Sequence, residues 1–131
     1  MSQRVPVRPG LFVEGPDGWR LIGSRCRGCG QSFFPKAKAI CLNCESEDLE
    51  EVRIAPTGTL YSWAPSNVPT AHFRPPFTVG YVTLENGVRI ASQLIEADGK
   101  PFRIGMPMRA RMETLWQDGD TEFFGYRFEP A

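Results

Sequence analysis

The four cysteines of the chain form two Cys-x-x-Cys pairs separated by eleven residues, and no cysteine is left over. The first pair is Cys26 and Cys29, and the second is Cys41 and Cys44. Two residues between paired cysteines allow a tight turn that points both sulfurs at one ion, and two such turns complete a tetrahedron. Four thiolates leave no open position for water or substrate. The pattern therefore predicts a structural zinc site, with iron as a chemically reasonable substitute.

Redox dithiols or two local disulfides are the competing interpretation of these cysteines. A thioredoxin-type motif needs one reactive pair beside a βαβ unit, and the sequence shows no such pattern. The N-terminal residues contain no apolar stretch of signal-peptide length, and no run approaches the length of a membrane span. We therefore expect a cytoplasmic protein, in a reducing compartment where closely spaced cysteines are more often metal ligands than disulfides.

A mainly β fold is expected because 13 Gly and 12 Pro interrupt the 131 residues throughout and leave little room for a long helix. Five segments rich in β-branched and aromatic residues follow the cysteines and predict strands. They are residues 59–64, 78–84, 88–95, 108–115 and 122–128. Five strands after a small metal module indicate a closed barrel, since closure removes exposed sheet edges.

The connections between these strands carry further signals. Asn86-Gly87 predicts a type I′ hairpin turn, and residues 117–120 predict a second hairpin. Residues 45–51 are the one short stretch with helical character, and residues 97–105 are expected to form one helical turn or a loop.

We divide the chain into three parts. Residues 1–19 are expected to be an extended arm followed by one strand of a hairpin that turns at residues 15–18. Residues 20–54 form the zinc ribbon, in which Gly28 and Gly30 suit the unusual backbone angles of the first cysteine turn. Residues 55–131 form the barrel.

Several strings of residues, taken in order, resemble a family of acyl-CoA-associated proteins. They are Cys26-Arg27-Gly28-Cys29-Gly30, Phe33-Phe34-Pro35, the second cysteine pair, Ser46-Glu47-Asp48-Leu49-Glu50, Gly58-Thr59-Leu60-Tyr61-Ser62-Trp63, Gly87-Val88-Arg89-Ile90 and Ile104-Gly105-Met106-Pro107-Met108. That family joins a rubredoxin-like zinc ribbon to a C-terminal OB-fold barrel, and the resemblance covers roughly residues 11–129. Two departures are Leu42, where members often have Pro, and an N-terminal hairpin where many members have helices.

The resemblance implies a non-catalytic accessory subunit of a CoA-thioester enzyme of the thiolase, MaoC-type hydratase or aldolase class. It implies a hetero-oligomer in which this chain stabilises the catalytic subunit and contributes to the acyl-CoA site. The residues themselves agree, because the sequence contains no carboxylate dyad, Gly-rich phosphate loop or nucleophile motif.

Aromatic residues are the candidates for ligand contact outside the ribbon. Tyr61 and Trp63 are two residues apart and so share one face of a strand, either as core or as a stacking platform of the kind OB folds use. The same spacing at residues 124, 126 and 128 favours core packing, since alternate large apolar residues are what a half-buried strand requires.

The only histidine, His72, lies in a Pro-rich segment between two predicted strands. Catalysis would need a nucleophile or carboxylate near the imidazole, and no such motif surrounds it. Together with Phe73, Arg74 and Phe77, it combines aromatic surface with a fixed cation. That composition suits an anchor for a partner, or a contact with the adenine and phosphates of a ligand.

The main alternative is a module that binds single-stranded nucleic acid, because a zinc ribbon beside an OB barrel also describes such proteins. Five arginines are candidates to line its groove: Arg89, Arg103, Arg109, Arg111 and Arg127. The overall charge argues against it, since 15 Lys and Arg balance 15 Asp and Glu, whereas phosphate binding usually needs a basic surplus.

Overall fold

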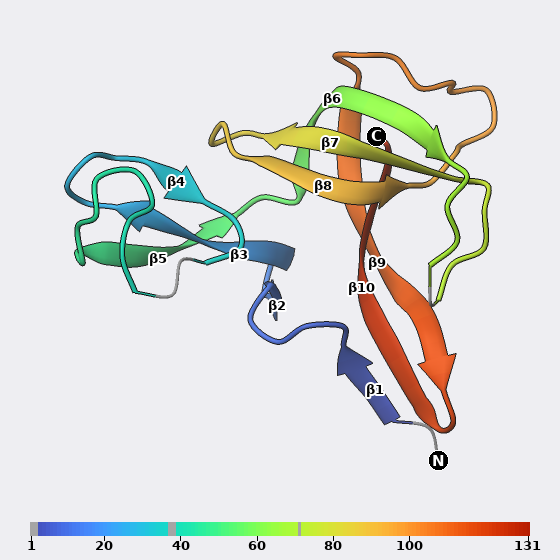
Figure 1. The fold of residues 1–131 in the computed structure, drawn as a ribbon, viewed down its shortest axis with the longest axis horizontal. Helices are drawn as coiled ribbons and strands as arrows, with labels where there is room; N and C mark the ends of the chain where they lie inside the picture. Colours follow the sequence, from blue (N-terminus) through green and yellow to red (C-terminus); the bar gives the residue numbers. More distant parts are fainter. Residues whose placement is uncertain (1–2, 37–38, 71) are drawn as a thin grey trace.

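The computed structural model describes residues 3–36, 39–70 and 72–131, and its regular elements are all strands (Figure 1). The ten strands are β1 (Gln3–Pro6), β2 (Phe12–Gly15), β3 (Gly18–Cys26), β4 (Ser32–Phe33), β5 (Leu49–Ile54), β6 (Thr57–Ser66), β7 (Phe77–Leu84), β8 (Arg89–Leu94), β9 (Pro107–Asp118) and β10 (Thr121–Pro130). Within the described ranges no helix is long and apolar enough to cross a membrane.

Strands β6 to β10 close into a barrel, with β6, β7, β8, β10 and β9 as neighbours in that order and β9 returning to β6. Strand β10 runs parallel to β8, and the other pairs are antiparallel. Both the strand count and this order are those of an OB fold. The predicted five-stranded barrel is therefore confirmed.

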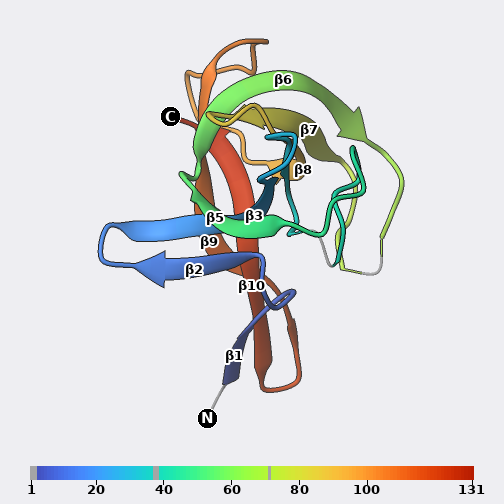
Figure 2. The same ribbon diagram turned by 90° about the vertical axis from the view of Figure 1, so that its left-hand side faces the viewer.

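The β9–β10 hairpin extends well beyond the barrel. Strand β6 pairs with β9 only over residues 107–109, whereas β9 and β10 stay paired as far as Asp118 and Thr121. Figures 1 and 2 show the hairpin projecting away from the barrel with β1 alongside. Strand β1 pairs in parallel with β10, from Gln3 opposite Thr121 to Pro6 opposite Phe124. The arm expected at residues 1–10 thus includes a strand of the large sheet.

The ribbon sheet is built on β3. The start of β3 pairs with β2, its end pairs with β4, and β5 lies along the opposite edge. The hairpin expected to turn at residues 15–18 is confirmed as β2 and β3. The expected helical character at residues 45–51 is wrong, because β5 begins at Leu49 and pairs it with Cys26. Our boundaries at 19/20 and 54/55 remain a proposed division.

The β7–β8 turn differs from the type I′ turn expected at Asn86-Gly87. A type I′ turn needs positive φ at two successive residues. Here Gly87 alone has a positive φ, of 87°, and its N–H donates to the Leu84 carbonyl over 2.9 Å. The Asn86 side-chain oxygen instead accepts the Val88 N–H. The segment 97–105 is a loop with a single bridge between Ala97 and Lys100.

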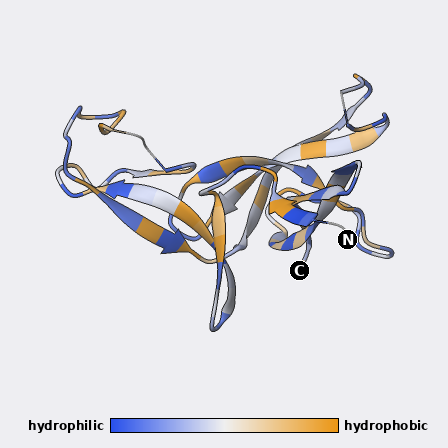
Figure 3. Ribbon diagram, turned by 90° about the horizontal axis from the view of Figure 1, so that it is seen from below, coloured by the Kyte–Doolittle hydropathy of each residue, from blue (hydrophilic) through white to orange (hydrophobic). Residues whose placement is uncertain are grey.

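Ribbon and barrel share one hydrophobic core. Hydrophobic and hydrophilic positions alternate along the strands (Figure 3), and the inward positions of the barrel form one cluster with Leu21 and Ile54 of the ribbon sheet. Phe128 is fully buried in this cluster, and Tyr126 packs between it and Phe34. Phe124 instead packs on the β2–β3 hairpin, against the rings of residues 12 and 19. These contacts fix the ribbon to the barrel.

Candidate functional site

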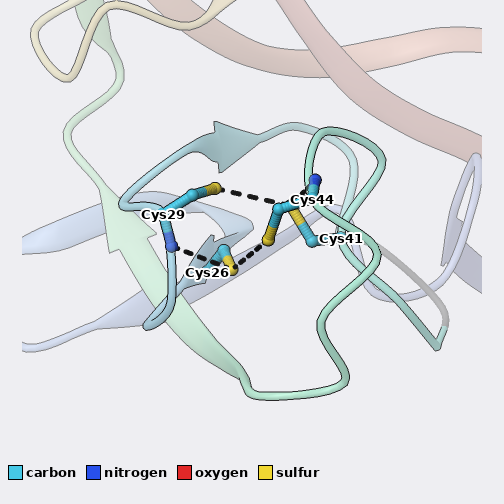
Figure 4. A group of neighbouring side chains, drawn as sticks. All are labelled: Cys26, Cys29, Cys41 and Cys44. Atoms are coloured by element: carbon cyan, nitrogen blue, oxygen red, sulfur yellow. Dashed lines mark hydrogen bonds between the residues drawn. The ribbon is translucent and has the colours of Figure 1, made fainter.

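The four cysteine sulfurs all lie within 4.8 Å of one another, and all four cysteines are free of disulfides (Figure 4). The Sγ atoms of Cys26 and Cys44 are 3.5 Å apart, and those of Cys29 and Cys41 are 3.7 Å apart. A tetrahedral ion with Zn–S bonds of about 2.3 Å requires sulfurs about 3.8 Å apart. The donor set therefore fits zinc, and the predicted structural zinc site is confirmed.

The two cysteine turns have matching backbones. In the first, the Gly30 N–H donates to the Cys26 carbonyl over 2.8 Å, and in the second the Glu45 N–H donates to the Cys41 carbonyl over 2.9 Å. Both donors have a positive φ, 80° at Gly30 and 65° at Glu45. Glu45 is the only non-glycine among the described residues with this conformation. We expected Gly28 to adopt an unusual backbone angle in the first cysteine turn. Its φ is not positive, so this expectation is wrong.

Backbone and side-chain N–H groups surround the sulfurs. The Cys41 Sγ accepts the N–H groups of Asn43 and Cys44 over 3.3 and 3.4 Å, and the Cys26 Sγ accepts the Cys29 N–H over 3.5 Å. The Asn43 side-chain amide also donates to the Cys29 Sγ over 3.5 Å. Donors of this kind stabilise thiolates, which are the form that binds metal.

The thiols differ in how readily they lose a proton. The amide of Asn43, helped by the Gln31 N–H and by the neighbouring Cys41 and Cys44 thiols, lowers the pKa of Cys29 to about 6. At Cys44 the Ser46 N–H lowers the pKa, but the adjacent Cys26 sulfur and burial outweigh it and raise the pKa to about 12. Thiolates this close repel one another, so a divalent cation is the natural replacement for the remaining protons. The filled thiolate set leaves no ligand position for chemistry.

Two of the predicted residues, His72 and Phe73, contact the projecting hairpin. His72 stacks on Trp116 of β9, with ring centroids 4.1 Å apart, and Phe73 meets the same indole edge-on at 6.0 Å. Phe73 also contacts Phe77. Arg74 is exposed and makes no ion pair among the described residues. Trp116 was not among the site residues predicted from the sequence. The one feature that could have pointed to it is its position as a bulky aromatic residue just before a hairpin turn.

Tyr61 and Trp63 do not form one stacking platform. A β-bulge falls between residues 60 and 62, so the simple alternation that the prediction required is broken. The Tyr61 ring lies beneath the Arg89 guanidinium, 3.7 Å from its centre, whereas the Trp63 ring lies 5.6 Å from Phe102. Among the described residues no ring contact joins either side chain to His72, Phe73 or Phe77, so the six predicted ligand residues are spread over three places.

Three of the five arginines proposed for a nucleic-acid groove are already paired. Arg109 and Arg111 contact Glu129, and Arg127 contacts Glu113 over 3.1 Å. Paired carboxylates cancel the positive field that phosphates would need. This arrangement weighs against the nucleic-acid alternative.

Comparisons with known proteins match both halves of the chain. Residues 20–50 match the model of the ChsH2 rubredoxin-like zinc ribbon domain, and residues 51–113 match that of the ChsH2 C-terminal OB-fold domain. The chain is 32% identical over 120 residues to a DUF35 domain-containing scaffold protein of Methanothermobacter thermautotrophicus, covering 88% of this chain and 90% of that one.

Two further matches name enzymes. The benzoylsuccinyl-CoA thiolase subunit BbsA of Thauera aromatica is 33% identical over 123 residues, which cover 92% of this chain and 84% of that one. A solved Ltp2-ChsH2(DUF35) aldolase structure superimposes with a TM-score of 0.67 at 29% identity, covering 86% of this chain and 85% of that chain.

Proposed function

Because the chain belongs to the DUF35 family, whose members join a ChsH2-type zinc ribbon to a ChsH2-type OB fold, we propose that it is a non-catalytic accessory subunit of a CoA-thioester enzyme. It binds and stabilises a catalytic subunit of the thiolase, hydratase or aldolase type, as part of a cytoplasmic hetero-oligomer. The observation that carries this proposal is the match to BbsA, a thiolase subunit, over 84% of its length.

The chemistry of the ribbon supports a non-catalytic role. A zinc ion with four thiolate ligands cross-links the segments that carry the cysteines. It has no open coordination position for a substrate or a nucleophilic water. The cysteines hold the ribbon, and the shared core positions the ribbon against the barrel. A ribbon of this size buries too little apolar surface to be stable without such a cross-link.

We further propose that the loop between β6 and β7 contributes to acyl-CoA binding. His72, Phe73 and Phe77 offer ring surface for the adenine, and the exposed, unpaired Arg74 offers a cation for phosphate. Tyr61 and Trp63 are separate candidates, since their rings have other neighbours. In this proposal the catalytic subunit supplies every reacting group.

Purification of the tagged chain from its native cells under gentle conditions tests the proposal. We expect a CoA-using enzyme to co-purify in fixed stoichiometry, and recovery of none would count against the accessory role. Cys41→Ser should release zinc and weaken this assembly. A variant that lost its metal yet assembled normally would separate zinc from partner binding.

The nucleic-acid alternative is tested by titrating a single-stranded oligonucleotide at several salt concentrations. Our proposal expects weak binding with little salt dependence. Tight binding that falls steeply with salt would favour the alternative, because released counterions dominate phosphate binding.

A further inference from the structure

The outer face of β6, β7 and β8 carries an open, largely apolar groove of about 540 Å³. The residues that line it include Trp63, Ala64, Val79, Tyr81 and Ala91. Among the residues whose side chains share this outer face, Val79 is 37% exposed and Tyr81 51%. Clustered apolar side chains with this much exposure are unusual on the surface of a soluble domain and mark interaction sites.

The groove follows from the strand register. Tyr81 on β7 is directly opposite Ala91 on β8, and Val79 is directly opposite Ala64 on β6. A small side chain therefore stands beside each large one, which leaves a depression on the sheet face. Val82, the residue after Tyr81, points the other way and is fully buried in the core. The exposed apolar residues of the groove therefore do not take part in packing the barrel interior.

The charge of this face is simple. Arg89 lies two residues before Ala91 on β8, so both side chains are on the outer face. Its guanidinium rests on the Tyr61 ring, and no carboxylate pairs with it among the described residues. Among the residues that the structure describes, this face therefore offers an apolar groove with the unpaired Arg89 guanidinium near its end. By contrast, Arg109 and Arg127 of the neighbouring hairpin are already neutralised by glutamates.

We propose that this groove is the docking face for the catalytic subunit, and this proposal rests on the proposed function. The contacting segment of the partner presents an aliphatic or aromatic side chain to the groove and a carboxylate to Arg89. Partly exposed aromatic residues beside an arginine are the composition of interface hot spots. A nucleic-acid strand fits less well, because one unpaired cation neutralises only one phosphate. The aromatic ring beneath Arg89 orders the guanidinium before the partner arrives.

The experiment uses the enzyme recovered with the wild-type chain, purified and titrated against variants of the full chain. Tyr81→Ala truncates the groove wall, and Arg89→Glu reverses the charge at its end. Arg53→Glu is the matched control, since Arg53 on β5 of the ribbon is exposed and forms no ion pair within the described part of the chain. Zinc content and melting temperature verify that each variant is folded. Because Arg89 is exposed, its variant is the one least subject to folding defects.

We expect Tyr81→Ala and Arg89→Glu each to weaken partner binding about tenfold or more, and Arg53→Glu to change it by about twofold at most. Hydrogen exchange of the wild-type complex should show new protection in residues 77–94. Partner affinity within about twofold of wild type for Arg89→Glu, without protection in β7 and β8, would overturn the docking face and leave the accessory function standing.

Recovery of no CoA-using enzyme with the wild-type chain would instead overturn the accessory function, and the docking face with it. A further arm uses a thymidine single strand of about 15 nucleotides as the probe. If Tyr81→Ala abolished binding of this strand while the enzyme affinity stayed unchanged, the groove would be a nucleic-acid site and the proposal would be wrong.

Discussion

The imidazole of His72 lies flat on the indole of Trp116, with ring centroids 4.1 Å apart and planes within 4° of parallel. His72 belongs to the loop between β6 and β7, whereas Trp116 stands on the part of β9 that projects beyond the barrel. Phe123 of β10 stacks on the same indole at 5.3 Å. The stacked rings of His72, Trp116 and Phe123 therefore attach the β6–β7 loop to the β9–β10 hairpin. This is the loop that we propose contacts acyl-CoA.

Replacing the indole should free this loop without unfolding the barrel. An aromatic pair contributes about 0.5–1.5 kcal/mol beyond its buried area, and Trp116→Ala removes the contacts of both His72 and Phe73. We expect faster hydrogen exchange in residues 72–77 and earlier proteolytic cleavage there. Trp63→Ala is the control, because its ring contacts Phe102 instead. Equal exchange in both variants would show that the stack does not hold the loop.

The sequence was sufficient to predict the metal site and the barrel strands, and the reason is local. Ligand spacing alone places the four sulfurs, since each cysteine pair needs only a tight turn to converge. The barrel strands were visible because runs of β-branched and aromatic residues are bounded by glycine and proline. Their observed ends differ by at most three residues from those expected.

What the sequence could not predict depends on residues far apart in the chain. The bulge in β6, which separates Tyr61 from Trp63, is set by how β7 pairs with it. Likewise, Trp116 meets His72 only because the hairpin projects past the barrel. The short ribbon strand β5 was mistaken for a helical stretch, since pairing with β3 overrides the local preference of an acidic segment.

Replacing Glu45 with glycine should stabilise the folded protein. Its φ of 65° is strained for a residue with a Cβ, and the equivalent position of the first cysteine turn is already Gly30. We expect Glu45→Gly to raise the free energy of unfolding by about 0.5–1 kcal/mol in urea titrations with excess zinc. Gly30→Ala should lower it by about 1 kcal/mol, although an added Cβ there meets no atom within 4 Å. Loss of stability in Glu45→Gly would contradict this explanation.

The Asn43 side chain should influence the pH at which zinc dissociates from the ribbon. Its amide makes the largest contribution to the contacts that lower the pKa of Cys29 to about 6, so this sulfur stays a thiolate, and a ligand, to lower pH than an ordinary thiol would. In Asn43→Ala the pKa of Cys29 rises, protons compete with zinc sooner, and the midpoint of zinc release moves to higher pH. Release is followed with a chromogenic chelator across an acid titration. Asn67→Ala, in an exposed loop, should leave the midpoint unchanged, and an unchanged midpoint in Asn43→Ala would remove the amide from this role.

Leu21 should couple ribbon and barrel into one folding unit. It is fully buried on β3, in the cluster that also contains Ile54 and the barrel residue Leu60. Truncating a buried leucine to alanine costs about 2–5 kcal/mol, from lost burial and from the cavity left behind. Since this core belongs to both parts, we expect Leu21→Ala to lower the urea midpoints of zinc release and of barrel unfolding together. Leu42→Ala, which truncates a leucine that is 78% exposed, should change the free energy of each transition by less than about 0.5 kcal/mol. If zinc release moved alone while the barrel transition stayed in place, the two parts would fold independently, and the partner would have to hold them in register.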